Sequence, residues 1–154
     1  MESLLRHGQV VPTFTLPSSD GASVRRTAYR DKRNLVLAFL PSAGDDGARA
    51  YLRALAEGYA AIQAETGEVL AILRGDQAAA AALKRDLALP FPVLADADGA
   101  TAARFLPPAA PAAVFVTDRY GELYFAAPAA DTASLPPVAA LHDWLVAIDR
   151  QCSI

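Results

Sequence analysis

The residue types best suited to chemistry are concentrated around one short stretch of the chain. Residues 41–48 read PSAGDDGA and follow six uninterrupted apolar residues, Leu35–Leu40. In α/β proteins, ligands and reacting groups commonly lie where a buried strand ends and faces a helix N-terminus. This stretch contains neither cysteine nor histidine. Asp45 and Asp46 are expected to cap the helix that follows, and the alternative is that they bind a cation or a basic partner group.

Nucleophiles and metal ligands elsewhere in the sequence are isolated from one another. The single cysteine, Cys152, excludes a disulfide within the chain and a cysteine-based zinc cluster. We expect it beyond the last helix as a reduced bystander, with an interchain disulfide or a redox role of the C-terminal tail as alternatives. His7 and His142 belong to no cluster, and Asp96 and Asp98 indicate a turn instead of a calcium loop. No metal and no other cofactor is predicted.

The composition is that of one globular domain spanning residues 1–154. Hydrophobic residues make up 53% of the chain and charged residues 20%, which argues against disorder. The net charge of -3 provides no basic surface, so nucleic acid is not an expected partner. No apolar run approaches the roughly 20 residues of a membrane helix. The N-terminus lacks the layout of a signal peptide, so we expect a cytoplasmic protein.

The pattern of apolar residues predicts elements that place residues 41–48 between a buried strand and a helix. The turn at Asp20–Gly21 indicates a short N-terminal β-hairpin, expected at an edge. Strand–helix–strand order implies a parallel pair, and a late hairpin adds antiparallel strands. We therefore expect an α/β fold with a mixed central sheet flanked by helices. In chain order, the expected elements are strands Thr13–Leu16, Ser23–Arg25 and Leu35–Leu40, a helix from Asp45 or Asp46 past Ile62 with Gly67 as its C′ residue, strand Val69–Leu73, a helix over 77–87, the extended segment Pro90–Leu94, a helix over 100–105, strands Ala113–Thr117 and Glu122–Ala126, and a helix over 137–150.

Several segments, in unbroken order, carry a resemblance to a known family. They are Gly8–Leu16 with Asp20–Gly21, Leu35–Pro41, Val69–Ile72, Phe91–Gly99 and Pro111–Glu122. Over residues 8–126 the chain resembles the redoxin branch of the thioredoxin fold, which contains the peroxiredoxins (the alkyl hydroperoxide reductase/thiol-specific antioxidant group). The resemblance implies a thioredoxin-like fold with an N-terminal β-hairpin and an ancestry in antioxidant, thiol-based redox chemistry.

The residues that the resemblance would assign to catalysis are missing. Peroxiredoxins place the attacking thiol seven residues after the proline that ends the strand, and a threonine or serine at four. Counting from Pro41, these positions are Ala48 and Asp45. In a thioredoxin-type Cys-x-x-Cys alignment, the sulfur positions become Gly44 and Gly47. Neither alignment supplies a sulfur, and two aspartates at the helix N-terminus would oppose a thiolate there.

Two prolines remain of the site that the resemblance implies, Pro41 and Pro111. The arginine of peroxiredoxins is replaced by Ala112. By resemblance to thioredoxins, Pro111 is expected to follow a cis peptide bond and to face the vacant cleft. The sequence leaves open whether this cleft is free or is filled by side chains such as Phe39 and Leu40.

Two hypotheses of function follow. The first is a catalytically inactive redoxin-like protein that binds another protein or a small molecule, with a homodimer expected from the resemblance. The second is a thiol-dependent antioxidant oxidoreductase, a peroxidase or disulfide reductase, in which Cys152 of the same or a neighbouring chain supplies the sulfur.

Overall fold

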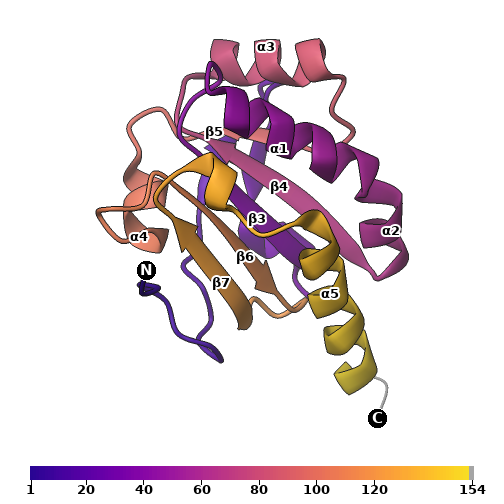
Figure 1. Cartoon of the computed structure of the whole chain (residues 1–154). Coiled ribbons are helices and arrows are strands. Elements are labelled where there is room, and N and C mark those ends of the chain that lie inside the picture. The colour runs from indigo at the N-terminus through magenta and orange to yellow at the C-terminus, as the bar shows by residue number, and fades with distance from the viewer. Residues whose placement is uncertain (153–154) are drawn as a thin grey trace.

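A five-stranded mixed sheet in the order β5-β4-β3-β6-β7 organises the chain, with helices on both of its faces (Figure 1). The computed structural model describes the backbone of residues 1–152 and the side chains of residues 1–151. The α/β, thioredoxin-like architecture predicted from the sequence is confirmed. The strands are β1 Thr15–Pro17, β2 Ser23–Arg25, β3 Asn34–Leu40, β4 Gly67–Leu73, β5 Val93–Ala95, β6 Ala112–Thr117 and β7 Leu123–Ala129, and the α-helices are α1 Asp46–Glu57, α2 Tyr59–Ala64, α3 Gln77–Leu87, α4 Ala100–Phe105 and α5 Val138–Cys152.

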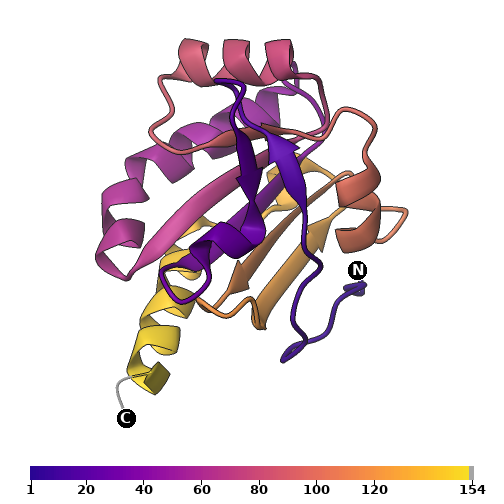
Figure 2. The same cartoon turned by 180° about the vertical axis from the view of Figure 1, so that it is seen from behind.

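The central strand β3 is apolar because both of its faces are covered. It runs parallel to β4 and antiparallel to β6, and all seven of its residues are buried. Side chains at alternate positions enter two cores. Val36, Ala38 and Leu40 pack with the long helices α1, α3 and α5. On the other face, Leu35, Leu37 and Phe39 pack with α4 and the N-terminal hairpin, which crosses the sheet in Figure 2.

The long helix expected after Asp45 is two helices, which corrects the prediction. Asp45 is the N-cap, one of the two residues proposed for that role, but α1 ends at Glu57 and α2 begins after Gly58. A β-carbon at Gly58 would lie 2.9 Å from the Val138 side chain, so glycine admits the start of α5 here. Gly67 is not a C′ residue, because the chain leaves α2 through Thr66, at φ 59°, and Gly67 begins β4.

The short N-terminal β-hairpin predicted from the sequence is confirmed, as a separate two-stranded sheet joined to the edge strand β5 by a bridge between Ser18 and Leu94. Other boundaries differ from expectation. Strand β1 covers Thr15–Pro17 and not Thr13–Leu16. Strand β7 extends to Ala129, three residues past the expected end. Cys152 does not lie beyond the last helix, since the backbone of α5 reaches it; its side chain lies outside the described residues.

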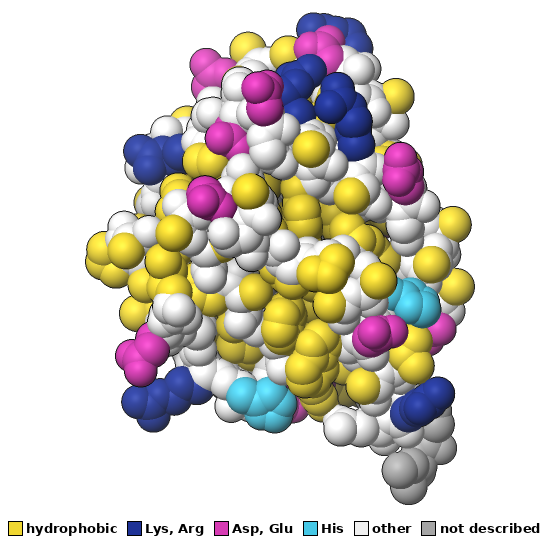
Figure 3. Space-filling view, viewed as in Figure 1, with side chains coloured by type: hydrophobic (Ala, Val, Ile, Leu, Met, Phe, Trp, Pro, Cys, Tyr) yellow, Lys and Arg dark blue, Asp and Glu magenta, His cyan; other side chains and the backbone are white. Residues whose placement is uncertain are grey.

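Hydrophobic side chains gather in the middle of the face that carries α1, α5 and β7, with most charges nearer the rim (Figure 3). Phe125 of the edge strand β7 stacks on Trp144 of α5, with ring centroids 5.5 Å apart.

No helix within the described chain combines the length and the apolarity that crossing a membrane requires.

Candidate functional site

The N-terminus of α1 is capped by a carboxylate of the chain itself. Asp45 Oδ2 accepts hydrogen bonds from the backbone N–H of Ala48 and from the hydroxyl of Thr132, both at 2.7 Å. Thr132 begins a short 3₁₀ helix, Thr132–Ser134, that packs against the start of α1. An exposed helix N-terminus favours anions, a thiolate among them. In this protein the Asp45 carboxylate already holds an amide that could stabilise such an anion.

The positions where the resemblance places sulfur are packed differently from one another. Ala48 is 1% exposed and belongs to the core that contains Leu40 and Leu135. A β-carbon added at Gly47 would collide with the hydroxyl of Thr132, whereas one at Gly44 would meet nothing within 4 Å. The 3₁₀ helix therefore covers part of the region where a thiol-based site would need access for its substrate.

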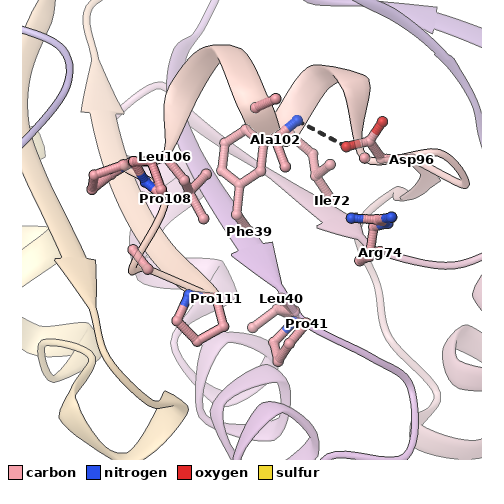
Figure 4. A pocket seen from close by; sticks show the side chains of 14 residues that line it. Phe39, Leu40, Pro41, Ile72, Arg74, Asp96, Ala102, Leu106, Pro108 and Pro111 are labelled. Atoms are coloured by element: carbon pink, nitrogen blue, oxygen red, sulfur yellow. Dashed lines mark hydrogen bonds between the residues drawn. The ribbon is translucent and has the colours of Figure 1, made fainter.

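An open cavity remains next to this filled position. It has a volume of about 370 Å³ and lies between the carboxyl ends of β3 and β4, helix α4 and the proline-rich connector to β6 (Figure 4). Pro41 and Pro111 both line it, so the structure brings together the two prolines singled out in the sequence. Phe39 and Leu40 form part of its wall without filling it. A cleft of this size is in the range of small-molecule sites.

The other predicted site residues do not line the cavity. Gly44, Asp45, Gly47 and Ala48 lie on the α1 side of Pro41, outside its lining. The expected cis bond before Pro111 is wrong, because residues 1–152 contain no cis peptide bond. The physical preference of a single X–Pro bond is for trans, by about 0.5–1 kcal/mol, and only the resemblance had suggested otherwise.

Two charged side chains line the cavity, and they differ in burial and in partners. Asp96 is 1% exposed, and its two carboxylate oxygens accept the backbone N–H groups of Thr101 and Ala102 at 3.2 and 2.8 Å. It therefore holds the first turn of α4 in place. Arg74 is exposed and follows β4 directly; its backbone N–H donates to the carbonyl of Leu40 at 3.0 Å.

Sequence reasoning missed Arg74 as a site residue, although a signal was present. Arg74 directly follows the second buried strand of the predicted parallel pair, and the carboxyl ends of parallel strands meet at one edge of a sheet. That rule would have placed it beside Pro41. Thr132 had no such signal, because only the three-dimensional path of the segment after β7 brings it to Asp45.

The C-terminal end of helix α5 lies at the end of the sheet where β3 begins, opposite the end that carries Pro41. Asn34, the first residue of β3, donates from Nδ2 to Asp149 Oδ1 at 3.2 Å. A seven-residue strand spans about 20 Å, so Asp149 lies about that far from Pro41 at the other end of β3. At this end of the strands, the Glu65 carboxyl holds its proton to donate to Asp149, and this hydrogen bond, followed by partial desolvation, raises the pKa of Glu65.

The described part of the chain has no cluster of side chains that could ligate a metal ion. Nowhere among those residues do three or more His, Cys, Asp or Glu side chains come together in a way that could hold an ion. His7 instead packs edge-on against Tyr124, with ring centroids 5.5 Å apart. Asp98 accepts the backbone N–H of Ala100 at 3.0 Å within the turn before α4.

Comparison with known proteins identifies the family. The model of the AhpC/TSA family matches residues 7–125. The chain belongs to the AhpC/TSA family. A curated relative, peroxiredoxin bcp1 of Schizosaccharomyces pombe, is 30% identical over 99 residues, which cover 64% of this chain and 51% of the relative. The chain thus matches about half the length of that relative.

Solved structures of low sequence identity share the fold. Peroxidoxin BcpB from Mycobacterium tuberculosis superimposes with a TM-score of 0.82 at 19% identity, covering 94% of this chain and 98% of its own. A putative protein disulfide isomerase from Bacteroides thetaiotaomicron gives a TM-score of 0.80 at 16% identity, with coverages of 96% and 92%. This member of the AhpC/TSA family therefore keeps the peroxiredoxin-like fold without a cysteine in the loop between β3 and α1.

Proposed function

We propose that this AhpC/TSA family member is a binding module without thiol chemistry at the β3–α1 loop, and that it holds a small molecule in the cavity beside Pro41 and Pro111. Two features together carry the proposal: the N-terminus of α1 is capped, and an open cavity lies beside it. The Asp45 carboxylate caps α1 and also accepts a hydrogen bond from Thr132. The cavity has a volume of about 370 Å³.

The second candidate is a thiol-dependent antioxidant oxidoreductase that uses Cys152. Family membership and the similarity to a peroxiredoxin favour it. The position of Asp149 argues against action of Cys152 at Pro41 in the same chain, because Asp149 binds Asn34 at the far end of β3. In this candidate, Cys152 would act at the β3–α1 loop of a neighbouring chain or within the C-terminal segment itself.

A homodimer is part of the proposal. Strand β7 is an edge of the sheet, and its residues from Tyr124 to Pro128 are only half-buried. Unpaired strand edges and apolar patches favour association. Light scattering after gel filtration gives the mass of the particle directly; a single-chain mass of 16.2 kDa at all concentrations would contradict the dimer.

Peroxide consumption with a dithiol reductant separates the two candidates. The protein and its Cys152→Ser variant are assayed in parallel, with an active peroxiredoxin as the positive control. We expect both proteins to match the rate of the reductant alone. Turnover that disappears with Cys152→Ser would support the oxidoreductase and would contradict a module without thiol chemistry.

A cytoplasmic location remains an expectation, which cell fractionation tests.

A further inference from the structure

The cavity wall carries one cationic side chain, Arg74, which lies between the end of β4 and the turn at Gly99. Arg74 is anchored at the end of β4 by the hydrogen bond from its N–H to the carbonyl of Leu40. Its guanidinium lies against Gly99, which has φ 73°, and a β-carbon on that glycine would collide with it. Glycine at position 99 therefore permits the turn and also leaves the space that the guanidinium occupies beside the cavity.

No carboxylate of the described residues forms an ion pair with this guanidinium. Arg74 has no acidic oxygen within 4.0 Å, unlike Arg85, which pairs with Asp86 on the surface of α3. Asp96 is the other charged residue of the cavity wall. Both of its oxygens accept N–H groups of α4 and it is 1% exposed. The charged group that the cavity exposes to a ligand is therefore the Arg74 guanidinium.

The other side chains that line the cavity are apolar. Phe39, Ile72 and Leu106 line it, together with alanines of α4 and prolines of the connector (Figure 4). Figure 4 shows the prolines Pro41 and Pro111 at one end and Arg74 to the side, next to Asp96. A ligand that fills this space must bury an apolar body and present an anionic group at one side.

We infer that the cavity binds a small molecule with an apolar body and one carboxylate, which pairs with the guanidinium of Arg74. The planar fork of arginine matches the two oxygens of a carboxylate, so the pair can be bidentate. The apolar body would lie against Phe39 and Leu106. This inference rests on the proposed binding function and names the chemical class of its ligand.

The test compares octanoate with octanol, a probe of the same chain length without the charge. Binding is followed by amide NMR shifts of the cavity residues in the full chain. We expect saturable shifts with octanoate at residues 102–106, and affinity about tenfold lower in Arg74→Gln, which corresponds to the loss of one charge-assisted pair that is exposed to solvent. Arg85→Gln removes the same charge from an exposed side chain outside the cavity and should leave the affinity unchanged.

Two more variants fix the location and the geometry. Ala102→Leu adds volume to the cavity wall and should prevent octanoate binding, while Arg74→Lys keeps the charge without the fork and should bind with intermediate affinity. Octanoate binding that persists in Ala102→Leu would place the site elsewhere and overturn the inference. A folded spectrum of each variant shows that a loss of binding is not a loss of structure.

The outcomes distinguish this inference from the proposed function. If octanol binds as tightly as octanoate, or if Arg74→Gln changes nothing, the carboxylate class is wrong and the cavity remains a binding site. If neither probe gives saturable shifts, the inference and the proposed ligand site both fail. Peroxide turnover that depends on Cys152 would contradict only the absence of thiol chemistry.

Discussion

Placing a thiol in the first turn of α1 tests whether this helix N-terminus can activate one. The substitution Ala48→Cys places sulfur at the position that corresponds to the attacking thiol, and Cys152→Ser in the same protein leaves it as the only thiol. Ala48 is 1% exposed, and its N–H is 2.7 Å from the Asp45 carboxylate. Because burial and a nearby negative charge both disfavour a thiolate, its pKa should exceed the ordinary value of about 8.5.

The size of the Asp45 contribution follows from Coulomb's law. At a separation of about 5 Å, two unit charges interact by about 3 kcal/mol at an effective dielectric constant of about 20, and by about 1 kcal/mol in bulk water. One pKa unit corresponds to about 1.4 kcal/mol. The Asp45 carboxylate should therefore raise the pKa of the introduced thiol by about one to two units.

The assay is the ultraviolet absorbance of the thiolate as a function of pH, with and without Asp45→Asn. Asparagine is as good an N-cap as aspartate and keeps an oxygen for the Ala48 N–H, so this change removes the charge and leaves the cap. We expect the thiol pKa to fall by about one to two units in Asp45→Asn. Equal pKa values in the two proteins, or a value below about 8.5 with Asp45 present, would refute the reasoning.

Two further predictions concern stability. Gly47→Ala should lower the free energy of unfolding by about 1–3 kcal/mol, because the added β-carbon collides with Thr132. Gly44→Ala is the control and should change it by less than about 0.5 kcal/mol, because its β-carbon meets open space. Equal denaturation midpoints for the two variants would contradict the packing of Gly47 against Thr132. Because the hydrogen bond that protonated Glu65 donates to Asp149 raises the pKa of Glu65, the folded state binds this proton more tightly than the unfolded state. That contribution to stability is lost as pH rises from the ordinary Glu pKa through the raised one. Glu65→Gln should therefore gain stability over the native protein as pH rises through this range, and thermal midpoints that keep a constant difference would argue against the Glu65–Asp149 pair.

Local sequence signals predicted the framework of the fold. The continuous apolar residues of β3 and β4 predicted strands covered on both faces, and Asp45 was one of two proposed caps for the following helix. The bounds of α3 and α4 also agree, since Asp76 caps the first and Gly99 precedes the second. These features depend on residues close together in the chain, which a pattern can detect.

The sequence patterns did not predict the contacts between segments that are far apart in the chain. The break at Gly58 depends on the approach of Val138, and the closure of α1 depends on Thr132, 87 positions from Asp45. The trans bond before Pro111 contradicted an expectation that came from resemblance alone. The rule for parallel strands could have placed Arg74 beside Pro41, but the cavity and the contact of Arg74 with Gly99 required the three-dimensional path of α4.

The central claim, that this family member has kept the fold without the thiol chemistry, is tested most directly by intact-mass analysis. The reduced protein is mixed with an equimolar amount of peroxide and sampled over the time in which an active peroxiredoxin is fully oxidised. We predict that the mass remains that of the reduced chain, with Cys152 unmodified. Rapid gain of one oxygen on Cys152, the mass of a sulfenic acid, or rapid formation of a disulfide-linked dimer would contradict it.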